Sequence, residues 1–163
     1  MSWTRVVGVV VAIAIASTTL IGQSAKPAQS ADPVVGTWVL NVAKSKFSPG
    51  PALKSESRTY TMVGQEIKAT SKGVGGDGKP TTGEWTIVYD GKDRPQTGNP
   101  DADTLSLKRV DAFTTEFTQK KAGKVVITGT RTISRDGKVM TITTKGTNAK
   151  GQAINEVEIF EKR

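Results

Sequence analysis

The sequence contains neither cysteine nor histidine. Without cysteine, the chain has no disulfide, no metal thiolate, no thiol nucleophile and no site for an N-terminal lipid on cysteine. Without histidine, it lacks the commonest general base and the commonest zinc ligand. These absences argue against an enzyme, and we identify no catalytic residue, no metal ligand and no cofactor site.

Long hydrophobic runs are also scarce. The apolar stretch 6–16 follows Arg5, and no further charge occurs before Lys26. This order is typical of a secretory signal peptide, and the run is shorter than the roughly 18–20 residues of a membrane-spanning helix. We predict a signal at 1–24, with cleavage before Ala25, or alternatively through residue 30, before Ala31. The mature protein would be periplasmic or secreted, with no membrane span after signal removal; retention as an anchor is the less favoured alternative.

The formal net charge is +8, and removal of the signal takes away only Arg5. Lysines recur singly along the chain, and the densest group is Lys120, Lys121 and Lys124. Scattered basic residues are typical of a solvated surface rather than of a polyanion site. We therefore expect no nucleic-acid partner, and we expect a monomer.

After a linker at 25–33, residues 34–163 alternate apolar and polar residues in short runs separated by glycine-containing turns. This is the pattern of half-buried strands, and Asp136-Gly137 is a strong hairpin signal. The predicted strands are 36–43, 55–63, 65–73, 82–90, 103–110, 112–121, 124–134, 138–147 and 153–161.

The predicted fold class is all-β, a single antiparallel up-and-down meander. Closing the sheet into a barrel of about 8–10 strands removes its open edges, although a two-sheet sandwich would also fit. Two irregular stretches, 44–53 and 90–101, are rich in proline and glycine and are expected to be loops.

The sequence also repeats itself without a gap after 73 residues. Arg58, Gly64 and Lys72-Gly73 recur as Arg131, Gly137 and Lys145-Gly146. An ancient duplication and a common use of hairpin residues both explain the repeat.

Strand alternation indicates three polar side chains as candidate ligand-binding residues. Arg58 and Tyr60 share one strand face, and Arg131 shares another with Ile127 and Ile133. Inward-facing arginines with a tyrosine could hold a carboxylate or phosphate group while apolar walls take a hydrophobic tail. The alternatives are a buried ion pair with an acid such as Glu56 or Glu158, or arginines that are exposed.

The carboxylates Glu156 and Glu158 also project from one strand face. We interpret them as part of a solvated outer face. A carboxylate-dependent hydrolase that uses Glu84, Glu156 or Glu158 is a minor alternative, and it requires two of these groups to approach within about 5–10 Å.

The opening Gly36-Thr37-Trp38 of the mature domain resembles the glycine-x-tryptophan opening of the calycin superfamily, which comprises lipocalins and fatty-acid-binding proteins. The resemblance implies a barrel with one end closed by Trp38 beneath a basic side chain of the last strand, here Lys162 or Arg163. It also makes a hydrophobic ligand plausible. The two lid helices and the last-strand arginine-x-tyrosine of fatty-acid-binding proteins are missing, because that strand reads Glu158-Ile159-Phe160.

The sequence thus predicts an exported lipocalin-like barrel that binds a small hydrophobic or amphipathic anionic ligand. The alternative is an envelope interaction or inhibitor domain, whose side-chain-filled barrel presents the loops 44–53 and 90–101 to a protein partner. The interior volume separates these hypotheses, because an empty interior implies a ligand.

Overall fold

The computed structural model describes residues 32–163. The predicted export signal, and all but the last two residues of the predicted linker, lie outside the described residues. Within residues 32–163 the structure contains no helix long and apolar enough to span a bilayer.

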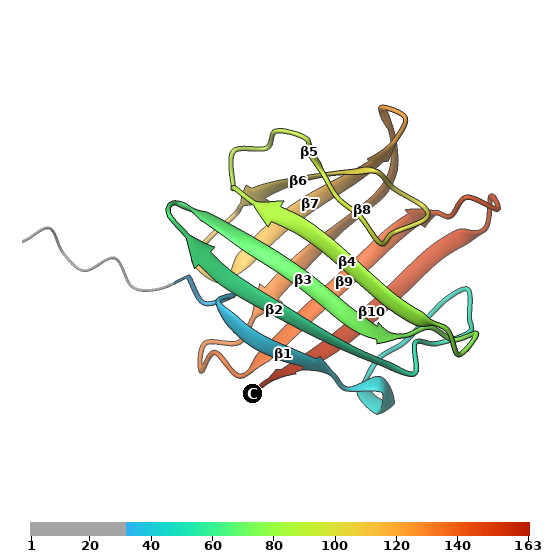
Figure 1. Ribbon diagram of the computed structural model, residues 1–163, viewed down its shortest axis with the longest axis horizontal. Helices are drawn as coiled ribbons and strands as arrows, with labels where there is room; N and C mark the ends of the chain where they lie inside the picture. Colours follow the sequence, from blue (N-terminus) through green and yellow to red (C-terminus); the bar gives the residue numbers. More distant parts are fainter. Residues whose placement is uncertain (1–31) are drawn as a thin grey trace, which may run out of the picture. The chain divides into compact units, whose positions relative to one another are not determined.

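Ten strands form one antiparallel sheet (Figure 1). They are β1 (Gly36–Leu40), β2 (Ser55–Val63), β3 (Glu66–Val74), β4 (Pro80–Ile87), β5 (Arg94–Pro95), β6 (Thr104–Arg109), β7 (Thr114–Lys121), β8 (Lys124–Ile133), β9 (Val139–Thr147) and β10 (Ala153–Lys162). Their order in the sheet is β4-β3-β2-β1-β10-β9-β8-β7-β6-β5. The sheet is therefore a meander in which pairing of the first strand with the last, Trp38 opposite Lys162, joins its two halves.

A seam between β4 and the segment that follows β5 brings the two edges of the sheet together. Trp85 and Gln96 form a single antiparallel bridge. The amide of Thr97 donates to the carbonyl of Glu84 at 3.0 Å, and the Thr97 hydroxyl accepts from the Glu84 amide at 3.1 Å. The barrel is thus nearly closed, and this confirms the predicted all-β meander barrel.

All nine predicted strands are present, within a few residues at their ends. The loop predicted at 90–101 contains the two-residue strand β5, which the proline and glycine signals concealed. The first strand ends at Leu40 rather than at residue 43, because Asn41 caps a short 3-10 helix, η1 (Val42–Lys44), by accepting from the Lys44 amide at 3.1 Å.

Trp38 is fully buried, and its indole N–H donates to the carbonyl of Val34 at 2.7 Å. The Lys162 ammonium lies 5.0 Å from the centre of the Trp38 ring. Both basic residues are exposed, but of the two only Lys162 lies over the Trp38 ring. Of the two basic residues, Lys162 is the partner of Trp38, because its strand register places it directly opposite the tryptophan.

The 73-residue repeat corresponds to two related hairpins, β2–β3 and β8–β9. Gly64 and Gly137 both turn the chain with positive φ, at 63° and 68°. The registers differ, because Arg58 lies opposite Ser71 whereas Arg131 lies opposite Ile142. Both arginines nevertheless point into the barrel.

Candidate functional site: a cavity inside the barrel

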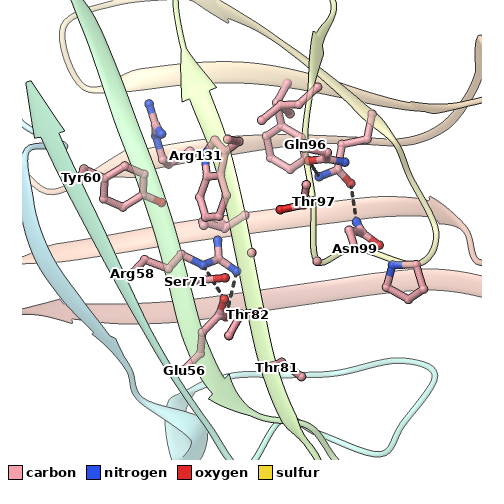
Figure 2. A pocket seen from close by; sticks show the side chains of 18 of the residues that line it. Glu56, Arg58, Tyr60, Ser71, Thr81, Thr82, Gln96, Thr97, Asn99 and Arg131 are labelled. Atoms are coloured by element: carbon pink, nitrogen blue, oxygen red, sulfur yellow. Dashed lines mark hydrogen bonds and ion pairs between the residues drawn. The ribbon is translucent and has the colours of Figure 1, made fainter. Parts of the chain in front are cut away.

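A cavity of about 350 Å³ occupies the barrel interior between β2, β3 and β4 on one side and β6, β7, β8 and β9 on the other (Figure 2). The segment 96–100, which follows β5, forms part of its wall. The interior is therefore not filled by side chains, contrary to what the alternative of a solid interaction domain requires.

The three predicted ligand-binding residues, Arg58, Tyr60 and Arg131, all line this cavity (Figure 2). Alternation along β2 and β8 brings them there, as expected from the sequence. Tyr60 is buried, and its ring meets that of Trp85 edge to face, with 6.0 Å between ring centres. The assignment of the three residues to a ligand stays a prediction.

Arg58 forms ion pairs with two carboxylates, the buried Glu158 and the partly buried Glu56. Its Nε and Nη2 donate to the two oxygens of Glu56 at 3.0 and 2.9 Å, and Nη2 also donates to Glu158 at 3.2 Å. The guanidinium lies 4.5 Å from the centre of the Phe160 ring. For Arg58, the buried pair that was the alternative to ligand binding is therefore present.

This cluster sets the ionisation of its members. Burial lowers the pKa of Arg58, but Glu56 and Glu158 more than reverse this effect and hold it well above its ordinary value. Burial raises the pKa of Glu158, and Arg58 only partly opposes the rise. One guanidinium is shared by two carboxylates, so the cluster holds no spare positive charge for a ligand.

Arg131 is in a different environment, although only 6% of its surface is exposed. Its Nη2 donates to the phenol oxygen of Tyr89 at 3.0 Å and lies 3.4 Å from the hydroxyl of Thr115. Burial raises the pKa of Tyr89, although Arg131 lowers it, so the phenol remains neutral at pH 7. Among residues 32–163, no carboxylate forms an ion pair with Arg131.

A buried guanidinium bonded only to neutral oxygens pays for its desolvation without full compensation. Nearby aromatic rings supply part of the missing stabilisation, because the Tyr60 and Tyr89 ring centres lie 5.8 and 5.9 Å from the guanidinium carbon. Arg131 can therefore bind an anion at the wall of the cavity.

A row of side-chain amides lies on the same cavity. Asn99 Nδ2 donates to Gln119 Oε1, and Gln119 Nε2 donates to Gln96 Oε1, both at 3.2 Å. The remaining amide nitrogen, Gln96 Nε2, is buried and has no hydrogen-bond partner in the described part of the chain. Sequence reasoning missed this row, because segment 96–99 lies in a loop whose path the residue pattern does not define.

The prediction that Glu156 and Glu158 form a solvated outer face is wrong. Glu158 is buried against Arg58, and Glu156 is half-buried on the same inner face of β10. Burial raises the pKa of Glu156 to about 7, with further contributions from Glu158 and Asp101 that Arg58 opposes. Both carboxylates face inward because Arg58 on β2 and the apolar neighbours Ile154 and Phe160 fix this face of β10.

The minor hydrolase alternative finds limited support. Glu84 is exposed on β4, away from the other two acids. Of the Glu156 and Glu158 pair, Glu158 is bonded to Arg58. Residues 32–163 contain no cluster of three potential metal-ligating side chains.

Comparison with known proteins shows similarity of fold alone. No family model and no curated protein sequence matches the chain. The structure of Rv2717c from M. tuberculosis is similar over 80% of this chain and 93% of that chain, with 13% identity and a TM-score of 0.52.

Two further solved structures each cover 80% of this chain. One is a redesigned beta barrel, with 13% identity over 92% of that chain and a TM-score of 0.46. The other is zebrafish ileal bile acid-binding protein complexed with cholic acid, with 14% identity over 99% of that chain and a TM-score of 0.49. The ten-strand meander and the likeness to the Rv2717c structure together show the fold alone, a nearly closed antiparallel β-barrel.

Proposed function

We propose that this chain is an exported binding protein that holds a small amphipathic anion inside its barrel. The observation that carries the proposal is Arg131, a buried cation that lines the cavity and forms no ion pair within residues 32–163. An anionic group on the ligand would supply the missing partner through charge-assisted hydrogen bonds.

The remainder of the cavity suits the apolar part of such a ligand. Leu105, Leu107, Phe117 and Ile142 line it. A volume of about 350 Å³ lies near the lower end of the roughly 300–1,000 Å³ typical of ligand pockets. The ligand is therefore small, of the size of a medium-chain fatty acid rather than of a phospholipid.

Binding is favoured over catalysis because, of the three acids considered for hydrolysis, Glu84 is exposed and Glu158 is bonded to Arg58, which leaves the half-buried Glu156 without a free acid partner. The order of charged and apolar residues at 1–24 supports export, so we expect the ligand to be met in the periplasm or outside the cell. Purification of the mature protein from a periplasmic or culture fraction, with N-terminal sequencing, tests this part of the proposal.

The ligand proposal is tested by fluorescence titration of the mature protein with anilinonaphthalene sulfonate, followed by displacement with medium-chain fatty acids and the matching fatty alcohols. Arg131→Met should weaken fatty-acid binding by about tenfold or more and leave alcohol binding unchanged, because only the acid uses the charge. Arg131→Lys should retain part of the affinity. Arg135→Met, which removes an exposed arginine four residues along the chain, is the matched control.

Failure of every probe to bind the wild-type protein would overturn the proposal. So would an equal loss of acid and alcohol binding in Arg131→Met, because that result would assign Arg131 a purely structural role.

A further inference from the structure

The cavity has charged side chains at two separate places. At one of them is Arg131, 6% exposed and without an ion-pair partner within residues 32–163. At the other is Glu56, which also lines the cavity, and Figure 2 shows Tyr60 and Arg58 between the two. The Arg131 guanidinium carbon lies 5.8 Å from the Tyr60 ring centre. Along β2, the Cα atoms of Tyr60 and Glu56 are about 13 Å apart, so the two places are far enough apart to bind different groups of one ligand.

Negative charge exceeds positive charge around Glu56. The single guanidinium of Arg58 pairs with both Glu56 and Glu158. Glu156 lies on the same inner face of β10 as Glu158, and Asp101 is close to it. Burial raises the pKa of Glu156 to about 7, Glu158 and Asp101 add to the rise, and Arg58 opposes it. Neither Glu156 nor Asp101 forms an ion pair within residues 32–163.

This surplus does not come from an acidic composition. The chain has 23 lysines and arginines against 15 aspartates and glutamates. Within residues 32–163, however, every lysine is exposed except Lys120, which pairs with Asp93. The interior acids are therefore compensated by Arg58 alone, and partly buried carboxylates without full compensation are unfavourable.

Glu56 has room for a further hydrogen-bond donor. Its two oxygens each accept one hydrogen bond from Arg58, at 3.0 and 2.9 Å, and a carboxylate can accept about four. A ligand ammonium at Glu56 would thus add the missing positive charge without replacing Arg58.

We infer that the ligand carries a cationic group that binds at Glu56, in addition to the anionic group that Arg131 binds. This inference rests on the proposed function and specifies its ligand class, a small zwitterion whose opposite charges are held apart by an apolar segment. An amino acid whose amino and carboxyl groups share one carbon could not reach both places.

The test uses the displacement assay at about pH 8, with medium-chain ω-amino acids and the ω-hydroxy acids of the same chain lengths. The end groups are similar in size and both are polar, but only the amino group is charged at this pH. For at least one chain length, the amino acid should bind about tenfold more tightly than the hydroxy acid.

Glu56→Gln removes the charge and keeps an acceptor for Arg58. In this variant the ratio of the two affinities should fall to near one, and circular dichroism checks that the barrel is intact. Glu158→Gln removes a second negative charge beside Arg58 and should lower the ratio severalfold. Glu116→Gln makes the same change at an exposed position of β7 and is the control, in which the ratio should not change.

The inference is overturned, and the proposed function retained, if the wild-type protein binds hydroxy acids but prefers the amino acid at no chain length. This comparison needs no variant, so it decides the question even if the glutamine variants do not fold. The inference also fails if folded Glu56→Gln keeps the wild-type ratio. If no fatty acid, hydroxy acid or amino acid binds, the proposed function fails and the inference with it.

Discussion

Arg58 and Arg131 line the same cavity, but only Arg58 is bonded to carboxylates. The difference follows from the neighbouring strands. Arg58 on β2 bonds to Glu158 on β10, which lies on the other side of β1, and Glu56 is two residues before Arg58. Arg131 on β8 instead has Tyr89 and Thr115 as its polar neighbours. Two residues that correspond in the 73-residue repeat thus differ in their partners: Arg58 is paired with carboxylates, whereas Arg131, the residue that we propose for ligand binding, contacts neutral oxygens.

Replacement of Arg58 should be strongly destabilising. Arg58→Met leaves Glu56 and Glu158 buried without their cation, which we expect to cost about 3–5 kcal/mol in the free energy of unfolding measured with urea at neutral pH. The triple variant Glu56→Gln, Arg58→Met, Glu158→Gln removes the unpaired charges and should recover most of the loss. A triple variant as unstable as Arg58→Met would show that packing, and not charge, accounts for the cost.

The stability of the barrel should fall as the pH rises from about 4.5 to about 7. Burial raises the pKa of Glu156 from 4.5 to about 7, so over this interval the folded chain holds a proton that the unfolded chain releases. The effect is on the order of 1 kcal/mol, since the carboxyl is only half-buried. Unfolding midpoints measured at several pH values should show a smaller slope in Glu156→Gln.

Part of the slope should survive in Glu156→Gln, because burial also raises the pKa of Glu158. The lowered pKa values of Asp77, Asp90 and Asp111 act in a different window, since their contributions are lost only as the pH falls below about 4. An unchanged slope in Glu156→Gln would contradict this account.

The seam should be sensitive to a single methyl group. Gly98 has φ of +83°, and a Cβ there would overlap the Thr82 carbonyl and the Gly83 backbone. Gly98→Ala should therefore speed hydrogen exchange at the Thr97 amide and cost more than about 2 kcal/mol. Gly91→Ala is the matched control, because Gly91 has a similar φ of +72° but no atom within 4 Å of its Cβ position.

Gly91→Ala should show only the backbone cost, about 1 kcal/mol. Equal costs for the two alanine variants, with unchanged protection of the Thr97 amide, would show that the seam yields without strain.

The identity of the residue over Trp38 can be checked at the end of β10. Lys162→Met removes the ammonium that lies 5.0 Å from the ring centre and should reduce the free energy of unfolding by about 0.5–1 kcal/mol. Arg163→Met should have no measurable effect, since of these two residues it is Lys162 that lies over the ring. The opposite ranking of the two variants would reassign the partner of Trp38.

The strands were predictable because alternation and turn residues define them locally. It was harder to predict which face of each strand points into the barrel, as β10 illustrates. Ile154 and Phe160 lie on one face with Glu156 and Glu158, while Val157 and Ile159 lie on the other. Each face carries two large apolar residues, so alternation alone could not assign the acids to the interior.

The structure resolves this ambiguity through contacts that are distant in sequence. Arg58 pairs with Glu158 from across the sheet. Next to β1, residues 46–48 pair with the edge of β10: Lys46 bridges Val157, and the Ser48 carbonyl accepts from the Asn155 amide at 2.8 Å. The cavity was unpredictable for the same reason, since its volume depends on how ten strands curve and not on any one of them.

The seam also affects how a molecule could reach the interior. Every neighbouring pair from β4 through β1 and β10 to β6 is joined by a ladder of at least three paired residues, whereas β4 meets the segment after β5 through one bridge, Trp85 with Gln96. Parting the edges there would break few hydrogen bonds and leave the rest of the sheet continuous. For the proposed ligand, exchange by this route would require only local opening and not unfolding of the whole barrel.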